Sequence, residues 1–163
     1  MSINPKMVVA ERDAILLTRA QLTRNQHTVT AVWTSPTYED NDAYERLIMS
    51  LVPYVTEAHI NVCEDKNVHP ADEINKALDS ATAPANRDAL ELVQAFLTRD
   101  EGGIYHVLKR AANTPRELAT ALAWHYGYLL TALLEPGGED LIARPVAVLD
   151  LRLTEHDMAG EDS

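Results

Sequence analysis

The feature that most constrains this chain is a long apolar helix signal that begins at Thr114. The tetrapeptide TPRE places Thr114 as an N-cap, Pro115 at the first helical position and Glu117 where it completes a capping box. The apolar run ALAWHYGYLLTALL follows at 121–134, before a glycine-rich stretch ends the helix. We therefore predict a helix over 114–135 that is apolar around most of its circumference, as a central or doubly packed helix of a bundle is.

The apolar part of this helix is too short to favour a membrane span. It covers sixteen residues, 119–134, whereas a transmembrane helix needs about twenty. Gly127 in its interior costs about 1 kcal/mol relative to alanine, so we expect another helix or a ligand to approach closely there. The helix is therefore expected to pack inside a soluble protein.

Four consecutive or nearly consecutive residues of this helix form the first candidate ligand site. Aromatic and histidine side chains can line an apolar pocket and still supply a few polar contacts. If the chain binds a small molecule, the sequence places it against Trp124, His125, Tyr126 and Tyr128. The simpler interpretation is that His125 is a hydrogen-bonded core histidine and that the aromatic residues pack in the core or at an interface.

Apolar residues at steps of three and four predict five further helices. They cover approximately residues 7–26, 44–62, 74–81, 89–97 and 104–111. Asp40 or Asn41 is expected to cap the helix over 44–62, and Asn86 is expected to cap the helix over 89–97. Pro53 is expected to kink or split its helix, because proline removes an amide donor. The glycine pair at 102–103 is interpreted as a helix stop.

Two segments leave the secondary structure open. HTVTAVW at 27–33 and LIARPVAVLDLRL at 141–153 suit either a helix or a strand. The predicted fold class is therefore all-α, a single-domain helical bundle of about six helices, with a minor β element as the open alternative. The helical domain covers 1–154, and residues 155–163 form a disordered acidic tail.

The chain carries a formal net charge of −11, and this charge is unevenly distributed. Residues 1–38 hold four basic and two acidic side chains, so they carry +2 and the remainder carries −13. An acidic body repels phosphate backbones, which argues against direct nucleic-acid binding and leaves a basic protein partner as the electrostatic match. The single cysteine, Cys63, allows no disulfide within the chain and suits a reducing cytoplasm.

The second candidate site is a metal site in the segment HINVCEDKNVHPADE. His59 and Cys63 are four residues apart, so they share a helix face, and His69 follows in a polar loop. Imidazole and thiolate are zinc ligands, but this spacing matches no standard zinc motif. The alternative is a frayed helix end with a half-buried cysteine, and no cofactor is expected.

The sequence contains no catalytic motif such as a nucleophile elbow or a glycine-rich phosphate loop. This favours a non-enzymatic cytoplasmic interaction or regulatory protein, such as an inhibitor, immunity or assembly factor, that acts through an acidic helical surface. The candidate contact residues lie in YEDNDAYE and are Glu39, Asp40, Asp42 and Glu45. The alternative is a helical-bundle protein or enzyme that binds a small ligand or a metal, with a pocket around His125.

The first predicted helix carries a heptad-like stripe. Its positions recur every seven residues and are Val8, Ile15, Leu22 and Val29. Because this helix is mildly basic and the rest of the chain is strongly acidic, it suits packing against the acidic body of a second copy, which would give a homodimer. The alternative is that the stripe completes the core of its own chain.

Overall fold

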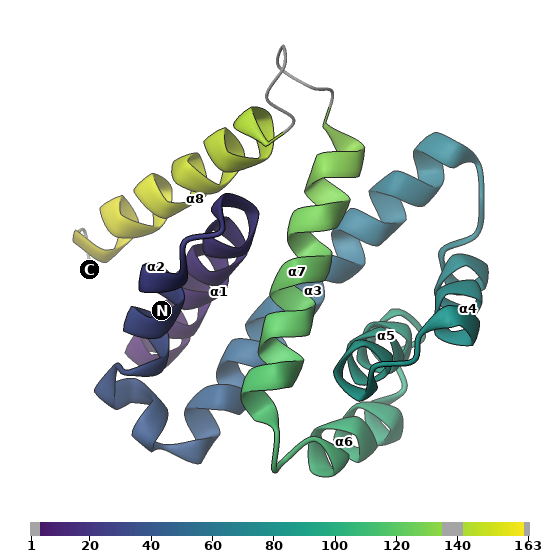
Figure 1. Cartoon of the computed structure of the whole chain (residues 1–163), viewed down its shortest axis with the longest axis horizontal. Coiled ribbons are helices and arrows are strands. Elements are labelled where there is room, and N and C mark those ends of the chain that lie inside the picture. The colour runs from purple at the N-terminus through teal and green to yellow at the C-terminus, as the bar shows by residue number, and fades with distance from the viewer. Residues whose placement is uncertain (1–3, 135–141, 162–163) are drawn as a thin grey trace.

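The computed structural model describes residues 4–134 and 142–161, and all of its regular structure is helical (Figure 1). These residues form eight α-helices and one 3-10 helix, with no strand among them. The elements are α1 (Pro5–Thr23), α2 (Gln26–Trp33), η1 (Pro36–Glu39), α3 (Asn41–Lys66), α4 (Pro70–Ser80), α5 (Pro84–Leu97), α6 (Glu101–Arg110), α7 (Pro115–Leu133) and α8 (Ala143–Glu161). The all-α class is therefore confirmed, although the sequence predicted about six helices rather than eight.

The two segments that the sequence left open are helical at 27–33 and 143–153, and Ile142 lies in a turn before the second helix. Residues 27–33 lie in α2, and Asn25 caps this helix by accepting the amide of Thr28 at 3.2 Å. The segment 141–153 begins with a residue outside the described range and then enters α8 at Ala143. A β element formed by these segments is therefore wrong, because their apolar residues turn one helical face inward instead of alternating across a strand.

α7 and α3 lie against each other along most of their length and form the middle of the fold (Figure 1). α1 and α5 flank α7 on its two sides. α8 packs mainly on α1, whereas α4 and α6 pack on α5. Most of the largest fully buried side chains come from α1, α3, α5 and α7 and include Ile15, Leu17, Leu47, Leu51, Leu92, Leu118 and Leu122. The apolar run of α7 thus occupies the central position that its composition predicts.

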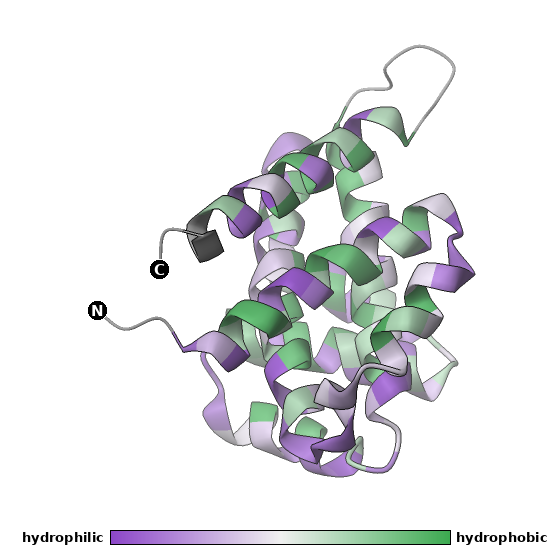
Figure 2. Ribbon diagram, turned by 90° about the vertical axis from the view of Figure 1, so that its left-hand side faces the viewer, coloured by the Kyte–Doolittle hydropathy of each residue, from purple (hydrophilic) through white to green (hydrophobic). Residues whose placement is uncertain are grey.

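Each helix mixes hydrophobic and hydrophilic residues (Figure 2), as expected when one face points toward a core and another toward water. α7 is the most apolar of them and has 19 residues. Of the helices in the described ranges, none combines the length and the apolar character needed to cross a membrane.

Proline marks the start of four of the α-helices. It occupies an early position, where the missing amide donor would be unpaired in any case, in α1, α4, α5 and α7, at Pro5, Pro70, Pro84 and Pro115. For α7 this confirms the predicted start. The predicted capping box is wrong, because the side chain of Thr114 makes no capping hydrogen bond.

Two predicted helix boundaries are also wrong. Asn86 does not cap α5 but lies in its first turn, because the helix already begins at Pro84. Gly102 and Gly103 do not end a helix but lie in the first turn of α6. Asp100 caps that helix by accepting the amide of Gly103 at 2.9 Å, which makes the glycines part of the helix start.

α3 is longer than the sequence suggested. It begins after Asp40, which is the N-cap as predicted, and continues to Lys66 into the segment expected to be a loop. Pro53 lies inside it without splitting it. The side chains of Val52 and Val55 are 0% and 1% exposed, so core packing on both sides of the proline keeps the two halves in one helix.

α8 crosses the predicted boundary between domain and tail. Residues 155–161 are helical, whereas the sequence predicted a disordered tail, and residues 162–163 lie outside the described residues. Two arginine ion pairs join this helix to α1: Arg12 with Asp157 at 3.0 Å and Arg19 with Asp150 at 2.6 Å. His156 Nε2 also lies 3.3 Å from Glu11 Oε2. Leu149, which is fully buried, anchors the helix to the core. One acidic residue of the predicted tail, Asp157, thus serves as the partner of a basic residue of α1.

α1 and α7 approach closely where Leu22 packs on Gly127. A Cβ atom added at Gly127 would lie 3.1 Å from Leu22 Cγ, closer than most real contacts. The close approach expected at this glycine is therefore made by a helix. Ile15, from the same heptad-like stripe as Leu22, is only 2% exposed. The stripe contributes to the core of its own chain, and a homodimer stays a prediction.

Candidate functional site

α7 has one face in the core and one face in solvent. Leu118 and Leu122, on the core face, are 1% and 0% exposed. Trp124 and Tyr128, on the outer face, are 50% and 59% exposed. Their rings stack with centroids 5.5 Å apart and an interplanar angle of 10°. We call these two residues the aromatic pair. Large apolar rings that remain this exposed on a central helix are candidates for binding.

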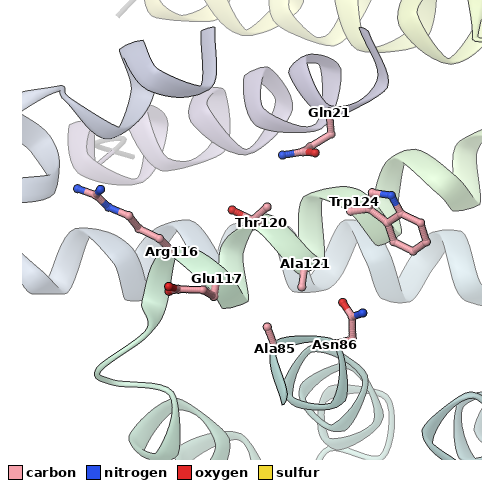
Figure 3. Close-up of a pocket in the computed structure, with 8 residues that line it drawn as sticks. All are labelled: Gln21, Ala85, Asn86, Arg116, Glu117, Thr120, Ala121 and Trp124. Atoms are coloured by element: carbon pink, nitrogen blue, oxygen red, sulfur yellow. The ribbon is translucent and has the colours of Figure 1, made fainter. Parts of the chain in front are cut away.

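A groove of about 600 Å³ opens beside the indole of Trp124 (Figure 3). The outer face of α7 forms its floor, and α1 and α5 supply side chains on either side. We call it the α7 groove, and its lining residues are Gln21, Ala85, Asn86, Arg116, Glu117, Thr120, Ala121 and Trp124. Its volume falls within the range of about 300–1,000 Å³ that is typical of ligand sites.

Four polar side chains of the α7 groove have no intramolecular hydrogen bond within the described part of the chain: Gln21, Asn86, Glu117 and Thr120. The same residue types are paired elsewhere. The hydroxyl of Thr131 donates to the carbonyl of Gly127 at 2.9 Å, which is the common arrangement for threonine in a helix. The free amides and hydroxyl of the groove are therefore available to a bound molecule.

Arg116 closes the other end of the α7 groove but is held by neighbouring aromatic rings. Its Nε donates to the hydroxyl of Tyr44 at 2.9 Å. Its guanidinium carbon lies 5.6 Å from the ring centroid of Trp33 and 6.0 Å from that of Tyr44, which are cation–π distances. The position of Arg116 is thus fixed before anything binds.

Trp33, Tyr38 and Tyr44 form an aromatic cluster between α2, η1 and α3. The centroids of Trp33 and Tyr38 are 5.5 Å apart, and those of Tyr38 and Tyr44 are 5.1 Å apart. The hydroxyl of Tyr38 donates to Asp13 Oδ2 at 2.7 Å. Burial raises the pKa of the Asp13 carboxyl, and this hydrogen bond acts in the opposite direction. Sequence reasoning did not identify this cluster.

The four residues predicted to line a ligand pocket separate into two pairs. Trp124 and Tyr128 point outward, whereas Tyr126 is 2% exposed and stacks on Tyr54 with centroids 5.4 Å apart. His125 is half-buried, and its Nε2 atom has no hydrogen-bond partner in the described structure. Burial, together with a smaller contribution from the neighbouring His59, lowers the pKa of His125 to about 4. Only Trp124 of the four lines the α7 groove.

The three predicted metal ligands are not brought into one ligand set. His59 and Cys63 lie on α3, where burial lowers the pKa of His59 and raises that of the Cys63 thiol. His69 instead caps α4, because its Nδ1 accepts the amide of Ala71 at 3.2 Å. In the described ranges no three histidine, cysteine or carboxylate side chains are placed to hold a metal ion.

The acidic residues predicted to form an interaction surface lie on η1 and the first turns of α3. Glu39, Asp42 and Glu45 are exposed. Asp40 already has internal partners: it caps α3, and its carboxylate lies 3.5 Å from Arg46. The hydrogen bond from the amide of residue 42 is the main reason that the pKa of Asp40 is lowered. Part of this surface charge is therefore compensated within the chain.

Comparison of the chain with protein-family models, curated proteins and solved structures gives no match. The candidate site therefore rests on geometry. Sequence reasoning found Trp124 but missed the rest of the α7 groove. One signal was present: Glu117, Thr120, Trp124 and Tyr128 recur at steps of three and four, which marks the outer face of α7. Gln21 and Asn86 come from distant helices, and no local pattern connects them to this face.

Proposed function

We propose that this protein is a non-enzymatic interaction protein that binds a partner protein through the aromatic pair and the α7 groove. The observation that carries the proposal is the half-exposed, stacked indole of Trp124 beside an open groove. Tryptophan, tyrosine and arginine are the residues that most often dominate binding energy at protein interfaces. A mutually stacked pair also loses little side-chain entropy on binding.

The charge of the chain supports a basic partner, and the single cysteine suits the reducing cytoplasm in which we place the protein. A net charge of −11 attracts positively charged proteins over a distance of about 10 Å at moderate ionic strength. The exposed carboxylates of Glu39, Asp42 and Glu45 then serve as a second, electrostatic contact. In this proposal the aromatic pair supplies most of the affinity, and the acidic surface increases the rate of association.

Affinity capture from the native host tests the proposal when it compares matched variants. Trp124→Ala removes the exposed indole of the site. Tyr105→Ala removes an aromatic ring that is 67% exposed on α6, outside the groove, and is the matched control. We expect the wild-type protein and Tyr105→Ala to retain the same specific partner, and Trp124→Ala to lose it.

Two results would contradict this proposal. Capture of the same partner by Trp124→Ala at wild-type strength would show that the aromatic pair is not the contact surface. Equal loss of the captured partner by Trp124→Ala and Tyr105→Ala would point to nonspecific adhesion by exposed aromatic rings. Repeating the capture in high salt then measures the electrostatic part, because screening weakens exposed charge pairs and leaves apolar contacts in place.

The second candidate function is small-ligand binding in the same groove, and its volume of about 600 Å³ is the observation that favours it. Ligand binding is then followed by the fluorescence of Trp124, since Trp124 lines this groove and His125 does not. In a Trp33→Phe background Trp124 is the only tryptophan. A saturable change of its fluorescence with a small metabolite, in the absence of any captured protein, would favour this function over the first.

A further inference from the structure

We infer that the α7 groove binds an extended segment of the partner by its main chain, with a basic side chain of that segment at the Trp124 end. The inference rests on the proposed function, because it names what the partner places in the groove. It adds the conformation and the charge of the bound segment.

The length of the outer face of α7 suits a short extended segment. Arg116 and Tyr128 are twelve positions apart, which corresponds to about 18 Å along a helix. An extended chain advances about 3.3 Å per residue, so roughly five residues span this face. Such a segment would pass the polar side chains of the α7 groove and reach the aromatic pair.

The free polar groups favour main-chain recognition. Gln21 on α1 and Asn86 on α5 lie on opposite sides of Thr120 and Ala121, which belong to the floor of the α7 groove (Figure 3). Each amide can donate to a carbonyl and accept from an N–H, and an extended segment offers both groups at every residue. A helix in the groove would satisfy its main-chain groups internally and leave these amides without partners. The observed chemistry therefore fits an extended segment better than a helix.

The free indole at one end of the α7 groove sets the place of the basic side chain. At the other end Arg116 and Glu117 lie together (Figure 3), so their opposite charges offset each other, and the guanidinium of Arg116 is already engaged by Tyr44 and Trp33. The exposed indole of Trp124 can accept a lysine or arginine side chain by a cation–π contact. The acidic body of the chain adds a favourable field for such a segment.

Peptide display tests this inference without knowledge of the partner. Short random linear peptides are selected on the wild-type protein, and the binders are synthesised with a fluorescent label for anisotropy titration. We expect a lysine or arginine to recur at one position of the selected peptides. The double variant Gln21→Ala/Asn86→Ala should bind them about tenfold more weakly or worse, which is about 1.4 kcal/mol. Gln94→Ala, on α5 but outside the groove, is the control and should bind as the wild type.

Methylation of single peptide nitrogens provides the decisive measurement. If Gln21 and Asn86 bind the main chain, N-methylation at one or two positions should weaken binding about tenfold, and the double variant should no longer respond to it. If neither the double variant nor N-methylation of the peptide weakened binding, the inference would be overturned. Selection of peptides that become helical when bound, seen by circular dichroism, would overturn it as well.

The outcomes also separate this inference from the proposed function. If no linear peptide binds but the captured partner still requires Trp124, the groove contacts a folded surface. In that case the extended-segment inference is wrong and the interaction function stands. If capture of the partner is independent of Trp124, the interaction site itself is wrong.

Discussion

The aromatic cluster and the aromatic pair are built from the same residue types but differ in how their polar atoms are used. In the cluster, the hydroxyl of Tyr38 binds Asp13 and that of Tyr44 binds Arg116. Both rings are less than 10% exposed. In the pair, Trp124 and Tyr128 stack on each other with half or more of their surface in water, and their polar atoms have no protein partner in the described residues.

The difference separates rings that stabilise the fold from rings that are free to bind. A buried ring whose hydroxyl already has a partner has no remaining polar group to offer a ligand. An exposed stacked ring contributes little to folding, because its apolar area stays in water. Substitutions in the aromatic cluster should therefore reduce stability, whereas those in the aromatic pair should reduce binding.

The largest expected effect is the difference in the free energy of unfolding between Tyr44→Ala and Trp124→Ala. Removal of the buried ring of Tyr44 should lower the free energy of unfolding by about 3–5 kcal/mol, because it leaves a cavity and frees Arg116. Trp124→Ala should lower it by about 1 kcal/mol or less. Urea denaturation followed by circular dichroism measures both. Similar losses in the two variants would remove the distinction between the cluster and the pair.

The next effect concerns His125, which adjoins the aromatic pair in sequence but points inward. Its pKa in the folded state is about 4, below its ordinary value of 6.5, so the folded protein binds fewer protons than the unfolded chain between these values. Its contribution to stability is complete above pH 6.5 and falls as the pH is lowered to about 4. The total loss from this group is roughly 3 kcal/mol.

His125→Gln should therefore lose less stability than the wild type between pH 7 and pH 4, with the urea midpoint as the readout. His106→Gln removes an exposed histidine on α6 and is the control, with the wild-type pH dependence expected. A pKa of His125 near 6.5, measured by NMR titration, would contradict the prediction.

The smallest expected effect is the difference in stability between two variants that each lose one tyrosine hydroxyl, Tyr38→Phe and Tyr128→Phe. Tyr38→Phe should cost about 1.5–3 kcal/mol at neutral pH, because the half-buried Asp13 carboxylate loses its donor. The loss should shrink at acidic pH, where Asp13 becomes protonated. Tyr128→Phe removes an exposed hydroxyl and should leave the unfolding midpoint unchanged within error. If Tyr38→Phe is equally neutral, the hydrogen bond to Asp13 does not stabilise the cluster.

The helical class could be predicted from the sequence because apolar periodicity is local. The start of α7 at Pro115 and the cap at Asp40 were found for the same reason. Extension of α3 through Pro53 and of α8 to Glu161 could not be found, since both depend on packing and ion pairs with distant helices. Local propensity alone therefore underestimated helix length.

The candidate site could be predicted only in part. The sequence indicated that Trp124 and Tyr128 are unusual, but a helical wheel that is apolar on most sides does not tell which side meets solvent. Neighbouring helices decide this: α3 covers one side of α7, and α1 and α5 flank it without covering the outer face. The groove is a tertiary feature, and its amides come from positions 21 and 86.

Gly127 does not line the α7 groove, but its lack of a side chain sets how closely α1 approaches α7 beside the groove. The side chain of Leu22 packs so closely on Gly127 that an added Cβ atom would lie 3.1 Å from Leu22 Cγ, and Gln21 precedes Leu22 in α1. The absence of one methyl group lets α1 sit close to α7 and so holds the Gln21 amide near the floor. An alanine at position 127 would require Leu22 to move by a few tenths of an ångström. It would thus alter the packing of α1 on α7 beside the groove from a position that no bound molecule contacts.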